Sequence, residues 1–203
     1  MQGVTGRLAA GPQRTEEHPI SKIVITEFLS LDGVMEDPRW TFEFDRGPEG
    51  DKFKLDELFA SEAMLLGRIT YAAFAQAWPG RTDEEGFADR MNTMAKYVVS
   101  RTLPDADATW GDTTVLRGDP VAEVRALRER PGGDLLVAGS GQLARMLISE
   151  GLFDELRLMV FPVILGAGIS LFPDGKTGAR LSLASAQQIR DGIMLMTYQP
   201  AAN

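Results

Sequence analysis

The sequence contains no cysteine and only one histidine, His18. Without cysteine the chain cannot form a disulfide, a thiolate zinc site or a cysteine nucleophile. This histidine lies in a polar segment near the N-terminus, and the sequence shows no cluster of metal-ligating residues and no Ser-His-acid arrangement. We therefore expect neither a metal site nor a nucleophilic triad.

Long apolar runs and an excess of positive charge are missing as well. No hydrophobic stretch approaches the roughly 18 residues of a membrane span, and residues 1–19 lack the apolar centre of a signal peptide. The 29 acidic residues outnumber the 21 lysines and arginines, which gives a net charge of −8. Nucleic-acid backbones and anionic membranes repel such a chain. We expect a cytoplasmic protein with no nucleic-acid or membrane partner, in which local groups hold any anionic ligand.

The hydrophobic pattern predicts one domain. Hydrophobic residues make up 44% of the chain, which is enough for one core. Residues 1–20 have no sustained periodicity and are predicted to be a flexible extension, whereas residues 21–200 form the domain. Buried strands alternate with helices, which predicts an α/β sheet. The last two predicted strands, at 156–161 and 193–198, have no clear helix between them, which indicates an antiparallel edge.

The stretch 134–151 is the one around which the chain is organised. A short apolar strand ends at residue 138, the turn Gly139-Ser140-Gly141 follows, and a helix then begins. Backbone N–H groups and the positive end of the helix dipole would converge there and form a phosphate cradle. The same glycines would equally suit a tight turn between packed elements. A standard Rossmann domain is disfavoured, because the next strand runs into Pro162 without the acid that binds the ribose.

Two other predicted strands end in similar residues, at Gly67-Arg68-Ile69-Thr70 and at Ser100-Arg101-Thr102. Ligands of open α/β sheets bind beyond the carboxyl ends of the strands, so the three turns should line one crevice. Arginines and hydroxyls around a glycine turn suit a polyphosphate, and an arginine near the ribose favours NADPH over NADH. Either arginine could instead be a solvated or helix-capping charge.

Seven motifs occur in one order along the chain and together resemble a known family. They are Ser30-Leu-Asp-Gly33, Met64-Leu-Leu-Gly-Arg-Ile-Thr-Tyr71, Trp78-Pro79, Lys96-Tyr-Val-Val-Ser-Arg-Thr-Leu103, Val137-Ala-Gly-Ser-Gly-Gln-Leu143, Asp154-Glu-Leu-Arg-Leu158 and Pro162-Val-Ile-Leu-Gly-Ala-Gly168. The chain resembles the dihydrofolate-reductase-like superfamily, in the branch of the reductase domain of bacterial riboflavin-biosynthesis enzymes. This resemblance implies a three-layer α/β fold, with a mixed, mostly parallel sheet of about eight strands flanked by helices. It also implies bound NADPH and a homodimer.

The resemblance further implies which residues bind the cofactor. They are Gly67, Arg68 and Thr70 around the phosphates, Ser100, Arg101 and Thr102 near the adenosine 2′-phosphate, and Gly139, Ser140, Gly141, Gln142 and Leu143 under the pyrophosphate. A non-proline cis peptide is expected between Gly139 and Ser140, where the family usually has a pair of glycines.

For the substrate side, the resemblance points to two acids. Dihydrofolate reductases keep a carboxylate early in the helix that precedes the Gly-Arg strand, where it binds the pteridine and assists protonation. Asp51 falls near that place, and Asp32 lies in the Ser-Leu-Asp-Gly turn close to the expected crevice. Either acid could instead cap a turn or a helix.

Together, these expectations predict that the protein is an NADPH-dependent reductase. Its substrate would be a small heterocycle, pterin- or pyrimidine-like, or a carbonyl or imine, and its reaction would be similar to that of 5-amino-6-(5-phosphoribosylamino)uracil reductase. A non-catalytic NADP(H)-binding or sensor protein on the same fold is the alternative. An interaction module with a vestigial cradle is a third possibility.

Overall fold

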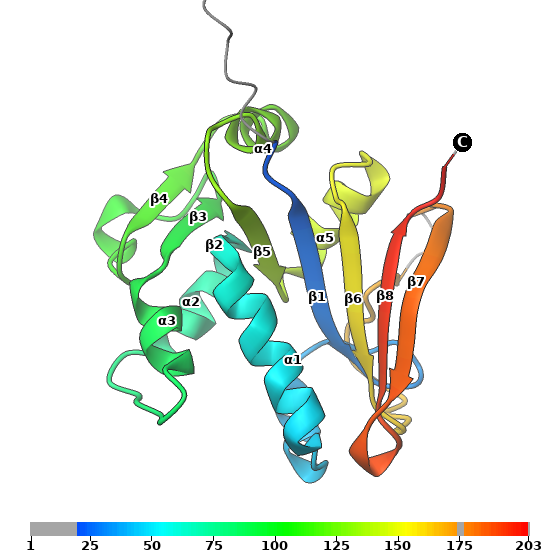
Figure 1. The fold of residues 1–203 in the computed structure, drawn as a ribbon. Coiled ribbons are helices and arrows are strands. Elements are labelled where there is room, and N and C mark those ends of the chain that lie inside the picture. The colour runs from blue at the N-terminus through cyan, green and yellow to red at the C-terminus, as the bar shows by residue number, and fades with distance from the viewer. Residues whose placement is uncertain (1–19, 174–176, 203) are drawn as a thin grey trace, which may run out of the picture.

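The fold, seen in a computed structural model, is described for residues 20–173 and 177–202. Apart from Ile20, the predicted N-terminal extension lies outside the described residues. An eight-stranded sheet in the order β4-β3-β2-β5-β1-β6-β8-β7 forms the centre of the molecule (Figure 1). The strands are β1 (Ile23–Leu29), β2 (Ser61–Gly67), β3 (Ala95–Val99), β4 (Thr113–Leu116), β5 (Asp134–Ala138), β6 (Glu155–Val160), β7 (Leu181–Gln188) and β8 (Met194–Pro200).

The sheet is mixed and mostly parallel, as predicted. Every pairing from β4 across to β6 is parallel. β8 runs antiparallel to β6 and to β7, which confirms the predicted antiparallel edge. β7 itself was not predicted, because its polar sequence lacks the β-branched and aromatic residues that indicate a strand.

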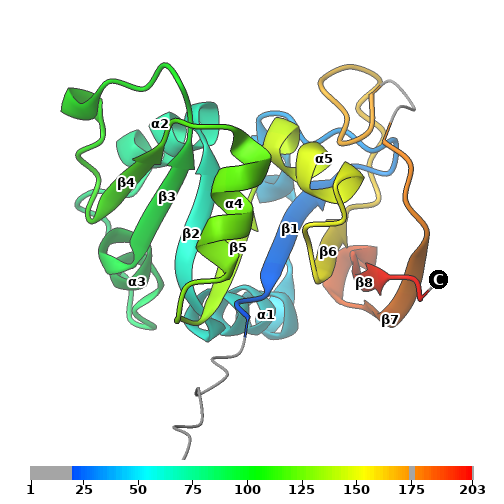
Figure 2. The same ribbon diagram turned by 90° about the horizontal axis from the view of Figure 1, so that it is seen from above.

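Helices cover both faces of the sheet and give the three predicted layers (Figures 1 and 2). α1, α2 and α3 bury side chains in a cluster on one face, and α4 and α5 do so on the other. Their bounds are α1 (Gly47–Ala60), α2 (Arg68–Ala77), α3 (Phe87–Thr93), α4 (Pro120–Arg128) and α5 (Gly141–Ser149).

No helix among the described residues has both the length and the apolar character needed to cross a membrane.

The central strand β1 is buried on both faces because its residues alternate between the two helical layers. Ile25 and Leu29 pack in the same cluster as the α5 residue Leu147, whereas Val24 packs with the α1 residue Leu58. Near its carboxyl end, however, β1 carries Thr26 and Glu27, which are also buried. Buried polar side chains are costly unless they are hydrogen-bonded, so these two residues require a specific explanation.

Candidate functional site

The three predicted turns follow neighbouring strand ends at one edge of the sheet. Gly67 is paired with Val99 and Val99 with Leu116, and Met64 is paired with Leu136, two residues before β5 ends, so β2, β3, β4 and β5 end close together. The third turn is closed by the Ser100 hydroxyl, which accepts hydrogen bonds from the backbone N–H groups of residues 102 and 103.

Two of the turns are bonded directly to each other. The backbone N–H of Gly67 donates to Ser140 Oγ at 3.0 Å, and the backbone N–H of Ser140 donates to Thr70 Oγ1 at 3.0 Å. The starts of α2 and α5, which follow these turns, therefore lie side by side.

Both helices begin without a side-chain cap. Ser140 precedes α5, but its side chain makes no capping hydrogen bond. Its hydroxyl is engaged with Gly67 N and also donates to the Ala138 carbonyl at 3.4 Å. Gly67 precedes α2 and has no side chain to offer. The first N–H groups of a helix lack intrahelical partners and carry its positive dipole end, so two such ends reinforce each other here.

The predicted cis peptide between Gly139 and Ser140 is wrong. Every peptide bond in the described residues is trans. Gly139 and Ser140 instead adopt successive left-handed conformations, with φ of 59° and 63°, and these reverse the chain. Gly139 also has a packing role, because a Cβ at this position would lie 3.3 Å from Thr70 Cγ2. The glycine turn thus serves close packing as well as leaving the start of α5 uncapped.

The two arginines predicted to bind phosphates are both exposed near these turns. Arg68 is the first residue of α2, and Arg101 follows the end of β3. Neither forms an ion pair with any residue that the structure describes. Thr102 and Gln142 are exposed as well, whereas Leu143 is buried in the core beneath α5.

Asp32 joins two loops. Its carboxylate accepts hydrogen bonds from Ser30 Oγ at 2.6 Å, Gly166 N at 2.8 Å and Leu165 N at 3.2 Å. These hydrogen bonds, that of Ser30 foremost, lower the pKa of Asp32 to about 2. Asp32 is therefore ionised at neutral pH, and its geometry favours the capping interpretation over that of a proton donor.

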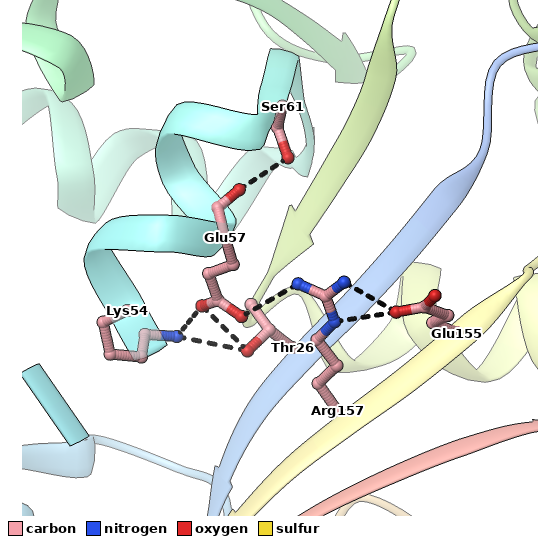
Figure 3. Close-up of polar contacts among 6 residues, drawn as sticks. All are labelled: Thr26, Lys54, Glu57, Ser61, Glu155 and Arg157. Atoms are coloured by element: carbon pink, nitrogen blue, oxygen red, sulfur yellow. Dashed lines mark hydrogen bonds and ion pairs between the residues drawn. The ribbon is translucent and has the colours of Figure 1, made fainter. Parts of the chain in front are cut away.

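Asp51 lies on the exposed side of α1, where its carboxylate is 2.8 Å from Arg46 Nη2. The carboxyl group that α1 buries is that of Glu57, which is 2% exposed. Glu57 Oε1 forms an ion pair with Lys54 and accepts a hydrogen bond from Thr26 Oγ1 at 3.1 Å (Figure 3). Lys54 Nζ also donates to Thr26 Oγ1 at 3.1 Å. These two hydrogen bonds with residues of α1 satisfy the Thr26 hydroxyl, which explains why it can be buried.

The second oxygen of Glu57 has no hydrogen-bond partner among the described residues. Arg157 Nη1 lies 3.9 Å from this oxygen, and Glu155 holds the Arg157 guanidinium through Nε at 2.9 Å and Nη2 at 2.6 Å (Figure 3). A buried carboxylate oxygen of this kind can accept an N–H group from a ligand. We call the group formed by Thr26, Lys54, Glu57 and Arg157 the α1-face cluster.

Aromatic rings flank the α1-face cluster. Lys54 Nζ lies 4.8 Å from the centre of the Phe28 ring, and Arg157 Cζ lies 6.0 Å from that of Phe53. Sequence reasoning missed Glu57. The available signal was its helical spacing, because Glu57 precedes the buried Leu58 and lies three residues after Lys54 on one side of the helix.

Glu27, on the opposite face of β1, is the other buried acid that sequence reasoning missed. Its Oε1 has no hydrogen-bond partner within the described residues. Burial raises the pKa of Glu27 to about 8, although the positive charges of Lys54 and Arg145 partly offset that effect. The sequence signal was a glutamate inside the apolar run from Ile23 to Leu29.

Comparison with known proteins relates this arrangement to characterised folds. A structure of a diaminohydroxyphosphoribosylaminopyrimidine deaminase/5-amino-6-(5-phosphoribosylamino)uracil reductase from Thermotoga maritima superposes with a TM-score of 0.67 at 15% identity, over 90% of this chain and 57% of that one. A dihydrofolate reductase from Enterococcus faecalis, complexed with NADP(H), superposes with a TM-score of 0.55 at 15% identity, over 89% and 97% of the two chains. These similarities establish a dihydrofolate-reductase-like α/β fold.

Sequence comparison gives the family. The uncharacterized protein YyaP of Bacillus subtilis (strain 168) is 27% identical over 180 residues, which cover 87% of this chain and 94% of YyaP. The family model described as RibD C-terminal domain matches residues 21–195. The chain therefore belongs to the RibD C-terminal domain family.

Proposed function

We propose that the protein is an NADPH-dependent reductase of a small heterocyclic substrate, pterin- or pyrimidine-like, or of a carbonyl or imine. The observation that carries the proposal is the pair of uncapped helix starts, at α2 and α5, which two hydrogen bonds hold together. A protein of net charge −8 that places two positive dipole ends and two arginines at one sheet edge is suited to a polyphosphate.

On the cofactor side, we assign the pyrophosphate to the first turns of α2 and α5. Arg68 and Arg101, which are exposed at the same edge, would bind the 2′-phosphate that distinguishes NADPH from NADH. The cofactor supplies the hydride when it is bound, so the protein need only orient the reactants and exclude water.

On the substrate side, we assign the α1-face cluster to the heterocycle. Thr26 is paired with Ala138, the last residue before the glycine turn, so this cluster lies at the level where β5 ends. The unpartnered oxygen of Glu57 would accept an N–H group of the ring, and Lys54 would keep the carboxylate in place. Glu57 thus replaces Asp51 as our candidate for the carboxylate expected from α1.

The first test is thermal unfolding with NADPH, with NADH and without ligand. A ligand at 100 times its dissociation constant adds about 2.7 kcal/mol to the free energy of unfolding, which shifts the midpoint by several degrees. We expect a shift with NADPH and a much smaller one with NADH. Equal shifts would refute the roles of the arginines, and no shift with either would refute the cofactor site.

The second test measures NADPH oxidation with a panel of pyrimidines, pterins, carbonyls and imines. We expect turnover with a ring that offers an N–H donor, and we expect Glu57→Gln to raise the KM for that ring. NADPH binding without turnover on the whole panel would favour the non-catalytic sensor.

We also propose that the protein forms a homodimer through β7. This edge strand is almost wholly exposed and has no charged residue from Leu181 to Gln188, whereas exposed edges are usually protected by charges or proline. We expect a dimer in light scattering after gel filtration and a monomer for Ser185→Lys. Ala126→Lys, on the exposed side of α4, is the control and should remain dimeric.

A further inference from the structure

Glu27 lies beneath the turn that joins β5 to α5. Gly139 N donates to the Thr26 carbonyl at 3.4 Å, so Glu27 is the first residue of β1 beyond the end of β5. Residues at alternate positions of a strand share one face, and Ile25 and Leu29 pack with the residues of α5. The Glu27 side chain therefore lies on the face that α5 covers, close to the start of that helix.

Few charged groups act on the buried Glu27 side chain. Its side chain is 4% exposed, and within the described residues its Oε1 has no hydrogen-bond partner. The charged groups that act on it are Lys54 from α1 and Arg145 from α5. Arg145 is itself occupied, because its Nη1 donates to the carbonyls of residues 170 and 171 at 3.5 and 3.1 Å.

The neighbouring strands and the following loop add little charge. Glu27 is paired with Leu158 on β6, and β5 contributes only the glycine turn. In the loop after β1, Asp32 is held by hydrogen bonds from Ser30 Oγ and Gly166 N, and Glu36 accepts a hydrogen bond from Ile169 N. An unpaired carboxylate in such a place is unfavourable, and burial raises the pKa of Glu27 to about 8.

We propose that Glu27 is part of the cofactor site and acts there as a neutral acid, so that binding of a nucleotide phosphate at the start of α5 is accompanied by uptake of one proton at Glu27. This inference rests on the proposed function. The proton comes from solvent and converts the carboxylate into the acid, and no bond of the nucleotide changes.

The direction of the effect follows from electrostatics. A phosphate beside Glu27 repels the carboxylate form of this residue. It also neutralises the partial positive charge at the helix start, which would otherwise stabilise that carboxylate. Binding therefore favours the acid form, whose O–H can also donate a hydrogen bond. By linkage, the affinity for the nucleotide falls as the pH rises above about 8, by up to about tenfold per pH unit.

The test is calorimetric titration of the full chain with NADPH at about pH 7 and about pH 9. Two buffers of different ionisation enthalpy at each pH give the number of protons taken up. The 2′-phosphate of NADPH, whose second pKa is near 6, is about nine-tenths ionised at pH 7 and fully ionised at pH 9, so it contributes almost no proton uptake. We expect close to one proton per NADPH at the higher pH and a small fraction of one at the lower pH.

Variants assign the proton to its site. Glu27→Gln should take up no proton and should bind NADPH with an affinity that changes by less than about twofold over this range. Glu150→Gln is the matched control, because Glu150 lies at the opposite end of α5, and it should behave as the wild type. If Glu27→Gln does not fold, Glu27→Met removes the titratable group at similar volume and takes its place.

The outcomes separate this inference from the proposed function. NADPH binding without proton uptake, or with equal uptake by the wild type and the Glu27 variant, would overturn the role of Glu27 and leave the cofactor site intact. A folded wild type that binds no NADPH at either pH would overturn both.

Discussion

The two faces of β1 hold buried carboxyl groups in opposite ways. On the α1 face, Glu57 is paired with Lys54 and accepts a hydrogen bond from Thr26. On the α5 face, Glu27 is equally enclosed but feels its nearest positive charges, Lys54 and Arg145, without hydrogen bonding to them. Burial alone therefore does not decide how an acid behaves. A cation within bonding distance makes an ion pair, and its absence favours the neutral acid.

The largest expected effect is on the pH dependence of stability. The pKa of Glu27 is about 8 in the folded protein and near 4.5 without its environment. Between these values the folded state binds the extra proton, so the free energy of unfolding falls as the pH rises from about 4.5 to about 8, by on the order of 5 kcal/mol. Glu27→Gln should remove this decline, as urea unfolding at about pH 5 and pH 9 would measure. The same decline in both proteins would contradict the comparison.

Breaking the Lys54–Glu57 ion pair on the α1 face should destabilise the protein at neutral pH. Lys54→Met removes the cation in direct contact with the buried Glu57 carboxylate and leaves only Arg157, 3.9 Å away. Removing one partner of a buried ion pair typically costs about 3 to 5 kcal/mol. Lys52→Met is the matched control, because Lys52 lies on the same helix but forms an exposed pair with Asp56, and it should cost less than about 1 kcal/mol. Similar losses in the free energy of unfolding for the two variants would show that the buried pair contributes no more to stability than the exposed pair.

The next effect concerns the cofactor. Arg68→Ala should weaken NADPH binding by about 1.5 to 3 kcal/mol, the usual size for a hydrogen bond to a charged group, and should affect NADH less. Arg130→Ala, at an exposed position after α4, is the control and should leave both affinities unchanged. Calorimetry with the two nucleotides measures the difference. Equal losses of affinity for both nucleotides would show that Arg68 does not bind the 2′-phosphate.

The smallest effect is expected at Asp32, whose pH dependence is opposite to that of Glu27. The pKa of Asp32 is lowered by its hydrogen bonds, so its contribution to stability is present at neutral pH and is lost as the pH falls toward about 2. Asp32→Asn should therefore be slightly less stable than the wild type at neutral pH and equal to it near pH 2 in urea unfolding. A large loss of turnover with unchanged stability would instead make Asp32 a catalytic acid.

The sequence predicted best what depends on neighbouring residues. A strand, a glycine turn and a helix start follow one another locally, so the turns after β2 and β5 could be located from their residues. Their mutual contact could not be deduced, because the bonds between Gly67, Thr70 and Ser140 join segments about 70 residues apart.

The buried acids were harder to predict because their roles depend on packing. Thr26 and Glu57 are 31 residues apart in the chain, and only the placement of α1 over β1 brings them together. The helical position of Glu57 could have marked it, whereas attention to the beginning of the helix led to Asp51. Likewise, Glu27 was visible within an apolar strand, but its missing partner is a property of the folded core.

The contact between Ser140, Gly67 and Thr70 has a consequence for the thermodynamics of ligand binding. Because two hydrogen bonds join the turns, the starts of α2 and α5 cannot separate unless both bonds break. A phosphate that spans them meets a surface that is already ordered, so little conformational entropy is lost on association. The ordering takes place when the protein folds. Mutations that break these hydrogen bonds should therefore leave the association rate constant unchanged and raise the dissociation rate constant of the complex.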